Sequence, residues 1–238
     1  MRTVYLGRCA YTEAMSTKIS PISNRTRKDK SIGSYFSDGV IKKFTNGETI
    51  INGFDEPTAV HLIKEGFVKA CSTSYDGHGN LVIVHESGEF IPLPWALDGY
   101  HVTGLSYVAI GNVTVIKSSK DKLRIAMGNN MWLTQEVLNQ AVNVIAIYTQ
   151  RIQILEFRSA RGRIIAEMLF LSERFGKSIG SGILIDAPLT HQDISDSINM
   201  NRETASRALE SLIKEGLIGQ NEHLFTILNP DKLREALK

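Results

Sequence analysis

The spacing of apolar residues changes near Asp121, and this change constrains the fold more than any other feature of the sequence. Upstream, between Asp38 and Lys120, apolar residues form short runs separated by glycines, such as NLVIVH and NVTVIKS. Runs of about four to eight residues that are rich in Val and Ile and bounded by turn residues are typical of antiparallel β-strands. Many such strands in succession predict a β-barrel or β-roll, which we place at residues 38–132.

Downstream of Asp121, apolar residues recur at steps of three and four, which predicts a long helix over residues 133–158. Two apolar stripes run along this helix, and a helix with two apolar faces needs two packing partners. One face can lie on the β-roll and the other on the same helix of a second chain, as a short coiled coil. We therefore predict a homodimer; burial of both faces within one chain is the alternative. We assign the dimer contact to the stripe of Val137, Ala141, Val144, Tyr148, Ile152 and Leu155, beside which lies the stripe of Leu138, Val142 and Ile145.

Residues 159–238 combine a shorter helix that ends at Gly176, a strand-like GILIDA, two closely spaced helices and the hairpin-like LIGQNEHLFTIL. This order predicts a winged helix-turn-helix. The first of the paired helices begins at Thr190, which forms a capping box with Asp193. Asn199 lies in the turn, where Asn tolerates a left-handed backbone, and Asn201 caps the second helix.

The second helix, residues 201–215, separates its side chains into two faces when they are placed at about 100° per residue. Ala205, Ala208 and Leu212 dock the helix, while polar residues lie on the opposite face. Arginine pairs with guanine in the major groove of DNA, glutamate accepts from cytosine, and serine contacts either base or phosphate. We therefore predict DNA contacts from Arg202, Glu203, Ser206 and Arg207, with further contacts from Thr190, Gln192 and Asn201. A solvated face with a Glu203–Arg207 ion pair is the alternative, which the four-residue spacing also allows.

Charge is distributed unevenly, although the net charge is only +2. Residues 158–238 hold eleven Lys or Arg against eleven Asp or Glu, so bulk charge does not favour nucleic-acid binding in the segment where we predict it. Residues 1–37 hold seven Lys or Arg against two Asp or Glu and lack a sustained period. We interpret them as a polar, basic and loosely docked N-terminal arm.

Several classes of protein are disfavoured by composition. Apolar runs break before membrane-spanning length and the N-terminus lacks a signal-peptide core, so we expect a cytoplasmic protein without membrane contact. The two cysteines, Cys9 and Cys71, do not form a zinc-binding pair, and we predict no metal site and no cofactor. His78, His85 and His101 lack the close spacing of a cupin-like metal enzyme, so we predict that the chain is not an enzyme.

Two motifs carry a resemblance to a known family. The stretch RETASR resembles the recognition-helix signature of the CRP/FNR family of bacterial transcription regulators. Arg202, Glu203 and Arg207 align with the base-reading positions of its cyclic-AMP receptor group, and Glu203, Ser206 and Arg207 match the E-x-x-S-R form of its FNR group. Upstream, the stretch from Lys42 to Lys69 resembles the opening of the family's β-roll through Phe44, Gly47-Glu48, Ile51, Gly53 and Leu62-Ile63-x-x-Gly66.

The resemblance covers residues 38–228 and implies an α+β fold. Its parts are an antiparallel β-roll of the cyclic-nucleotide-binding type (38–132), a dimerisation helix (133–158) and a winged helix-turn-helix (159–238). It also implies a homodimer that binds double-stranded DNA at a palindromic site with half-sites related to TGTGA or TTGAT. The family mostly recruits RNA polymerase, so activation is the expected output. A ligand-sensing or scaffolding protein whose helix-turn-helix contacts protein is the alternative.

The effector stays open because the roll departs from the family pattern. Members that bind a cyclic nucleotide carry, after a Gly-Glu pair, an arginine and a small hydroxyl residue that hold the phosphate. Here Gly88-Glu89 is followed by FIPLPWALDGYHVTGLSYVA, and no arginine occurs between Arg27 and Arg124. Without such a partner the cost of burying the charged phosphate is not compensated, so we do not expect cyclic AMP to bind.

Two other features of the roll bear on ligands. The chain has two cysteines and not the four that an iron–sulfur cluster needs. Haem bound through Cys71, His78 or His85 stays open as an alternative. The stretch IPLPW either lines an apolar ligand pocket or rigidifies the roll without any ligand.

Overall fold

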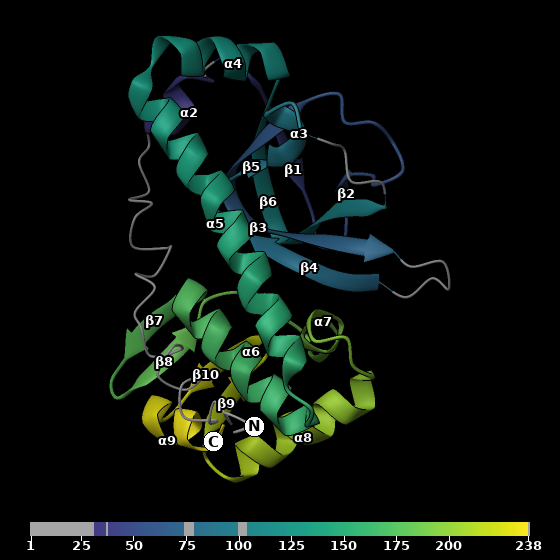
Figure 1. The fold of residues 1–238 in the computed structure, drawn as a ribbon, viewed down its shortest axis with the longest axis vertical. Helices are drawn as coiled ribbons and strands as arrows, with labels where there is room; N and C mark the ends of the chain where they lie inside the picture. The colour runs from purple at the N-terminus through teal and green to yellow at the C-terminus, as the bar shows by residue number, and fades with distance from the viewer. Residues whose placement is uncertain (1–30, 37, 74–78, 100–103, 238) are drawn as a thin grey trace, which may run out of the picture.

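The computed structural model describes residues 31–36, 38–73, 79–99 and 104–237. A β-rich part, a long helix and a mostly helical C-terminal part follow one another along the chain (Figure 1). None of the described helices is long and apolar enough to span a membrane.

The N-terminal part is the antiparallel roll predicted from the sequence. Its two longest strands, β3 and β6, pair along most of their length, with His61 opposite Lys117. The sheet has the order β1-β6-β3-β4, while β2 adds to β6 and β5 adds to β3. The strands are β1 Val40–Phe44, β2 Thr49–Ile51, β3 Val60–Thr73, β4 Gly79–His85, β5 Phe90–Ile91 and β6 Leu105–Ser118.

Three short helices close the roll: α2 Ser31–Ser34, α3 Leu93–Ala96 and α4 Lys120–Asn129. Ile91, Pro92 and Leu93 are buried while Pro94 is exposed, so the first part of the IPLPW stretch helps to fill the interior of the roll. Ile32 and Phe36 are also buried, and Phe36 packs edge-on against Phe90. The prediction that all of residues 1–37 form a loosely docked arm is therefore wrong for this end of the segment, because apolar side chains anchor it; residues 1–30 lie outside the described part.

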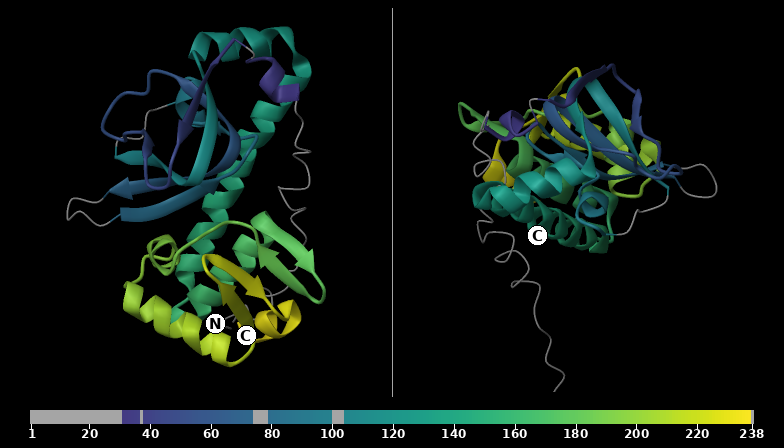
Figure 2. Two further views of the ribbon diagram at one scale, coloured as in Figure 1. Left: turned by 180° about the vertical axis from the view of Figure 1, so that it is seen from behind. Right: turned by 90° about the horizontal axis from the view of Figure 1, so that it is seen from above.

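The long helix α5 Met131–Glu156 begins and ends two residues earlier than the predicted range 133–158. Asn130 caps it by accepting a hydrogen bond from the backbone N–H of Leu133 at 2.9 Å. In Figure 1 α5 runs in front of the roll, and in the reverse view of Figure 2 the roll lies in front of α5. One side of the helix therefore packs on the roll, and the other side faces away from it.

The structure corrects our assignment of the two stripes of α5. Val137 is fully buried in its own chain, and Ala141, Val144 and Tyr148 pack partly against the same cores. Only two of the predicted dimer residues, Ile152 and Leu155, are exposed. The apolar side chains that α5 presents to solvent are Met131, Trp132, Leu138, Val142, Ile145, Ile152 and Leu155. The periodicity showed two adjacent stripes but could not show which of them the roll covers.

The C-terminal part is the predicted winged helix-turn-helix. Helix α6 stops at Phe175, directly before Gly176, and its buried residues pack under the paired helices α7 and α8. A four-stranded antiparallel sheet of the order β7-β8-β10-β9 includes the wing, which turns at Glu222 with φ of 52°. The elements are α6 Ala160–Phe175, β7 Gly176–Ile179, β8 Gly182–Ile185, α7 His191–Ser197, α8 Arg202–Lys214, β9 Ile218–Asn221, β10 Leu224–Ile227 and α9 Pro230–Glu235.

Candidate nucleic-acid interface

Local hydrogen bonds fix the angle between α7 and α8. Thr190 and Asp193 form the predicted capping box: the Thr190 N–H donates to Asp193 Oδ2 at 2.9 Å, and the Asp193 N–H donates to Thr190 Oγ1 at 3.1 Å. Asn199 adopts the predicted left-handed backbone, with φ of 48°. Asn201 Oδ1 then accepts from the Glu203 N–H at 2.8 Å, which caps α8 as predicted. These contacts fix where α8 begins, and its first residues, 201–204, are exposed.

The two predicted faces of α8 are present in the structure. Ala205 and Leu212 are fully buried, together with Leu209. On the opposite face Arg202, Glu203 and Arg207 are exposed and Ser206 is half-buried.

The ion pair considered as an alternative also forms on this face. Arg207 Nη2 lies 3.2 Å from Glu203 Oε2, but both side chains are almost four-fifths exposed. An exposed pair of this kind contributes only about 0.3–0.5 kcal/mol, so it leaves both groups available to a ligand.

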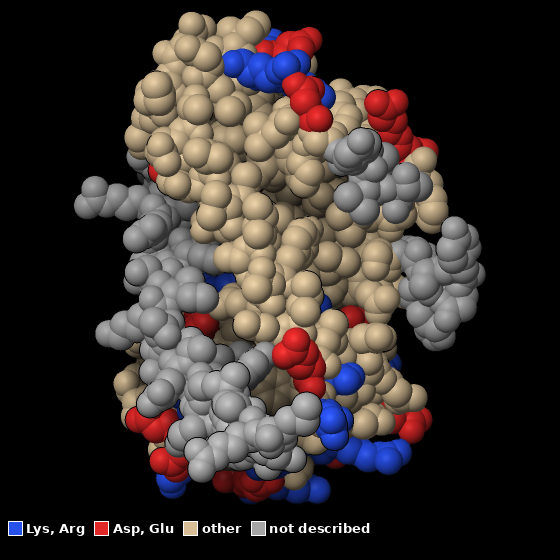
Figure 3. All heavy atoms as spheres, in the orientation of Figure 1, with Lys and Arg blue, Asp and Glu red and all other residues tan. Residues whose placement is uncertain are grey.

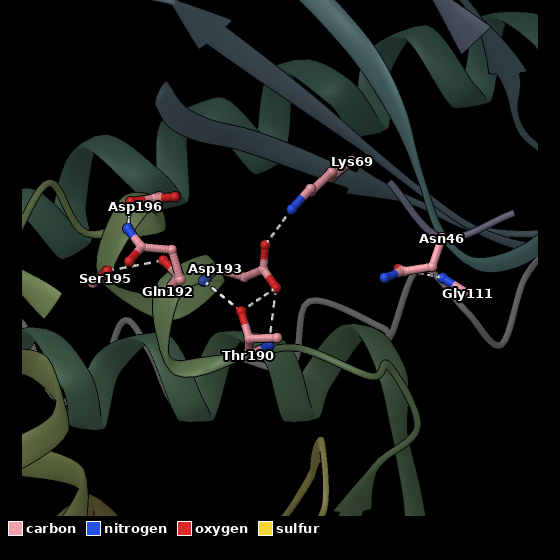
Figure 4. A network of polar contacts seen from close by, with 8 residues as sticks. All are labelled: Asn46, Lys69, Gly111, Thr190, Gln192, Asp193, Ser195 and Asp196. Carbon is pink, nitrogen blue, oxygen red and sulfur yellow. Dashed lines mark hydrogen bonds and ion pairs between the residues drawn. The ribbon is translucent and has the colours of Figure 1, made fainter. Parts of the chain in front are cut away.

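The three flanking candidates differ in how their polar groups are used. Thr190 donates its hydroxyl hydrogen to Asp193 Oδ2 at 2.6 Å and accepts from the Asp193 N–H at 3.1 Å, so only one lone pair of its hydroxyl oxygen is left for a ligand. Gln192 is exposed and donates to Asp196 Oδ1 at 2.6 Å (Figure 4). Asn201 is exposed beside the first turn of α8. All three candidates thus lie at the starts of α7 and α8, at the edge of the face formed by Arg202, Glu203 and Arg207.

His191 belongs to the same region and was missed by the sequence analysis. Its Nδ1 lies 3.0 Å from Ser206 Oγ on α8, and its Nε2 lies 2.9 Å from Gln220 Oε1 on the wing. The ring also stacks on Phe225 at a centroid distance of 5.9 Å. Ser206 and Gln220 are fifteen residues or more from His191 in the chain, so no local sequence pattern predicts these contacts.

Helix α7 is tied to the rest of the molecule at both ends. At its start, Lys69 Nζ of β3 lies 2.6 Å from Asp193 Oδ1 (Figure 4). At its end, Arg151 of α5 donates to the carbonyl oxygen of Ser197 and, at 2.8 Å, to that of Leu81 on β4. Charged groups therefore join the helix-turn-helix to the roll and to α5, in addition to the apolar core that the three parts share.

Asp193 and Lys69 are both held in their charged forms. Burial raises the pKa of Asp193, but the hydrogen bonds from Lys69 and Thr190 lower it by more, so its pKa lies below the ordinary value. Burial lowers the pKa of Lys69, but the hydrogen bond to Asp193 and the charge of that carboxylate raise it by more. Each group therefore stabilises the charge of the other.

The interior of the roll beside Glu89 is occupied by side chains of the roll, of α5 and of α6. Gln140 of α5 donates to the carbonyl oxygen of Gly88 at 2.9 Å and accepts from the Phe90 N–H at 3.1 Å. Glu89 Oε2 lies 2.6 Å from His85 Nδ1, and Glu89 Oε1 lies 3.5 Å from a guanidinium nitrogen of Arg174 on α6. Burial raises the pKa of Glu89, but the contacts with His85 and Arg174 lower it by more, so the carboxylate stays charged.

The remaining cavity beside these groups measures about 20 Å³, which is room for one water molecule. Neither Lys nor Arg is among the described residues that line it, which are His85, Glu89, Phe90, Leu93, Gln140, Asn143, Val144 and Ile147. A cyclic nucleotide does not fit this cavity, because the space is too small and a positive group for the phosphate is missing from its lining.

The residues considered for metal or haem binding are not brought together in the described part. His78 and His101 lie outside the described residues. His85 contacts Glu89, and burial raises the pKa of Cys71 to about 11, which disfavours the thiolate that ligates metals. Among the residues that the structure describes, no three His, Cys, Asp or Glu side chains are grouped to hold a metal ion.

Comparison with known proteins matches both halves of the chain. A model of the Crp-like helix-turn-helix domain matches residues 162–236, and a model of the cyclic nucleotide-binding domain matches residues 41–130. The nitrogen fixation regulation protein FixK of Bradyrhizobium diazoefficiens is 27% identical over 194 residues, which cover 82% of this chain and 80% of the relative. The global nitrogen regulator of Synechococcus elongatus is 25% identical, over 82% of this chain and 88% of the relative. The solved structure of FixK2 from Bradyrhizobium japonicum shares the fold, with a TM-score of 0.69 at 20% identity over 83% of this chain and 96% of that one.

Proposed function

Because the chain belongs to the CRP/FNR family of DNA-binding transcription regulators, and is not an enzyme, we propose that it acts as a homodimer on a palindromic operator. Each α8 then enters the major groove of one half-site. The observation that carries this proposal is the division of α8 into two faces. One face is fully buried through Ala205, Leu209 and Leu212, while Arg202, Glu203 and Arg207 are exposed to solvent on the other.

The exposed stripe of α5 supports the homodimer. Leu138, Val142, Ile145 and Ile152 follow one another at steps of four, three and seven residues, which is the spacing of the core positions of a coiled coil. Figure 3 shows mostly uncharged residues over the upper part of α5, on the side that faces away from the roll. A second copy of α5 offers the same uncharged surface, so two copies can bury these stripes against each other.

We assign base reading to Arg207 and Glu203, with Arg202 beside them. Arg207 has the geometry to bond both acceptors of a guanine, and Glu203 accepts from a cytosine amino group. We assign phosphate contacts to Thr190, Gln192 and Asn201, because these polar residues lie at the starts of α7 and α8. These roles agree with half-sites related to TGTGA or TTGAT.

The proposed output is activation through RNA polymerase, as the family resemblance implies, although the position of the operator relative to a promoter also decides this. A regulator of this kind acts on chromosomal DNA, so we place it in the cytoplasm. We do not expect cyclic AMP to be its effector, because the cavity in the roll is small and neither Lys nor Arg is among the described residues that line it.

Selection from random double-stranded DNA with the purified protein, with and without cell extract, tests this function. We expect enrichment of a site with two-fold symmetry whose half-sites lie about 10 base pairs apart, one turn of the helix. Failure to enrich any sequence under either condition would contradict DNA reading and favour a role in protein contacts. Enrichment of a single half-site would contradict the dimer alone.

A further inference from the structure

His191 joins the three elements that surround the DNA-reading face. It is the first residue of α7, and its two ring nitrogens contact Ser206 on α8 at 3.0 Å and Gln220 on β9 at 2.9 Å. The ring is held flat against the fully buried Phe225 of β10, with an angle of 24° between the two rings. Because both ring nitrogens and one ring face are engaged, the imidazole has a defined orientation.

The direction of each hydrogen bond in this chain of contacts follows from the wing. Gln220 donates from Nε2 to the carbonyl oxygen of Glu222 at 2.9 Å, which turns its amide oxygen toward His191. An amide oxygen only accepts, so the hydrogen of the ring lies on His191 Nε2. In a neutral imidazole the other nitrogen is then an acceptor, so the Ser206 hydroxyl donates its hydrogen to His191 Nδ1.

This arrangement determines what Ser206 can offer to DNA. A serine hydroxyl has one hydrogen and two lone pairs, and here the hydrogen is already used inside the protein. In the major groove the donors are the amino groups of adenine and cytosine, whereas guanine and thymine present acceptors at equivalent positions. Resting on the function proposed above, we propose that His191 is a positioning residue that makes Ser206 an acceptor and so selects an adenine or cytosine amino group.

The replacement His191→Phe tests this inference, because it keeps an aromatic ring on Phe225 but removes both ring nitrogens. The base pair read by Ser206 is first located as the operator position at which Ser206→Ala loses preference. Affinity is then measured for operators with each of the four bases at that position. We expect the preference for adenine or cytosine to fall by about threefold to tenfold in His191→Phe, the effect of one hydrogen bond, because the hydroxyl is freed to donate. The preference for the guanine facing Arg207 should not change.

The double variant His191→Phe with Ser206→Ala supplies the matched control. If His191 acts through Ser206, the double variant loses no more preference at this position than Ser206→Ala alone. A His191→Phe protein that binds all four operators more weakly by one factor, with its preference intact, overturns the inference, since His191 would then only hold the fold together. The inference is equally wrong if Ser206→Ala changes preference at no position. A wild-type protein that selects no sequence contradicts the proposed function instead, and the two failures are therefore distinguishable.

Discussion

Lys69 Nζ on the roll lies 2.6 Å from Asp193 Oδ1 on α7, and the same carboxylate closes the capping box of that helix through Thr190. The Asp193 side chain is 6% exposed and the Lys69 side chain 27%, so the pair is largely shielded from solvent. A shielded carboxylate that loses its cation loses stabilisation that water cannot fully replace. The contact therefore joins the stability of α7 to the position of the roll.

We expect Lys69→Met to lower the free energy of unfolding by about 1.5–3 kcal/mol, the contribution of a hydrogen bond to a charged group. Methionine keeps the aliphatic part of the side chain and removes the amine. Urea denaturation measures the change. The control is Lys43→Met, which makes the same substitution at an exposed position of β1 and should be nearly neutral. Equal effects of the two variants would show that the contact does not stabilise the protein.

The lowered pKa of Asp193 predicts how stability depends on pH. A carboxylate whose pKa is lower in the folded than in the unfolded state stabilises the fold above its unfolded value, here 3.8, and loses that effect as the pH falls through the folded value. Asp193→Asn should therefore be less stable than the wild type by a constant amount above about pH 5, and the difference should shrink below about pH 4. Urea denaturation of both proteins at a series of pH values on either side of this range measures the difference in their free energies of unfolding. A difference that persists unchanged in acid would contradict the assignment.

The helix-turn-helix was predictable at the level of single residues because its signals are local. The capping box needs Thr190 and Asp193, the turn needs Asn199, and the cap of α8 needs Asn201, all within a few positions of the structure they specify. The division of α8 into two faces depends only on helical periodicity.

Contacts between distant segments were not predictable in the same way. Lys69 and Asp193 are 124 residues apart, and nothing near either residue indicates that they meet. The same holds for His191 with Gln220 and for the burial of Phe36 against Phe90. These contacts depend on how the helices and strands pack against one another. The local pattern of a single sequence does not show that packing.

The two stripes of α5 predict different effects of substitution. Ile145→Lys places a charge at the centre of the exposed stripe, so we expect it to raise the dissociation constant of the dimer by at least about thirtyfold, or roughly 2 kcal/mol. Val137→Ala instead removes buried methyl groups, and we expect it to lower the free energy of unfolding by roughly 1–3 kcal/mol without weakening the dimer specifically. Analytical ultracentrifugation and urea denaturation measure the two quantities.

The control for Ile145→Lys is Ile41→Lys, which introduces the same charge at a comparably exposed isoleucine of β1. It should leave the dimer intact. If Ile41→Lys weakens the dimer while Ile145→Lys does not, the interface lies on the roll and the assignment to α5 is wrong.

The filled interior of the roll predicts that cyclic AMP has no effect. Gln140 occupies the backbone groups of Gly88 and Phe90, and the cavity of about 20 Å³ leaves no room for a nucleotide. A ligand that binds only the folded state raises the melting temperature, so an unchanged melting temperature shows that the ligand does not bind. We expect millimolar cyclic AMP to change neither the melting temperature nor the affinity for the selected operator. A rise in either would show that the roll opens to admit the ligand.

The assignment of Arg207 as a reader of guanine predicts a specific loss of discrimination. Arg207→Ala should weaken binding to the selected operator by about 1–3 kcal/mol and relax the preference for guanine at one position of each half-site. The control is Arg234→Ala on α9, because Arg234 is also exposed and also forms an ion pair at 3.2 Å, with Asp231. Loss of that arginine removes an equal charge outside the reading face and should change neither affinity nor preference appreciably. Gel-shift titrations against operators substituted at each position measure both variants. If Arg207→Ala weakens binding to every sequence equally, the guanidinium contacts phosphate, and base reading must be assigned to other residues of α8.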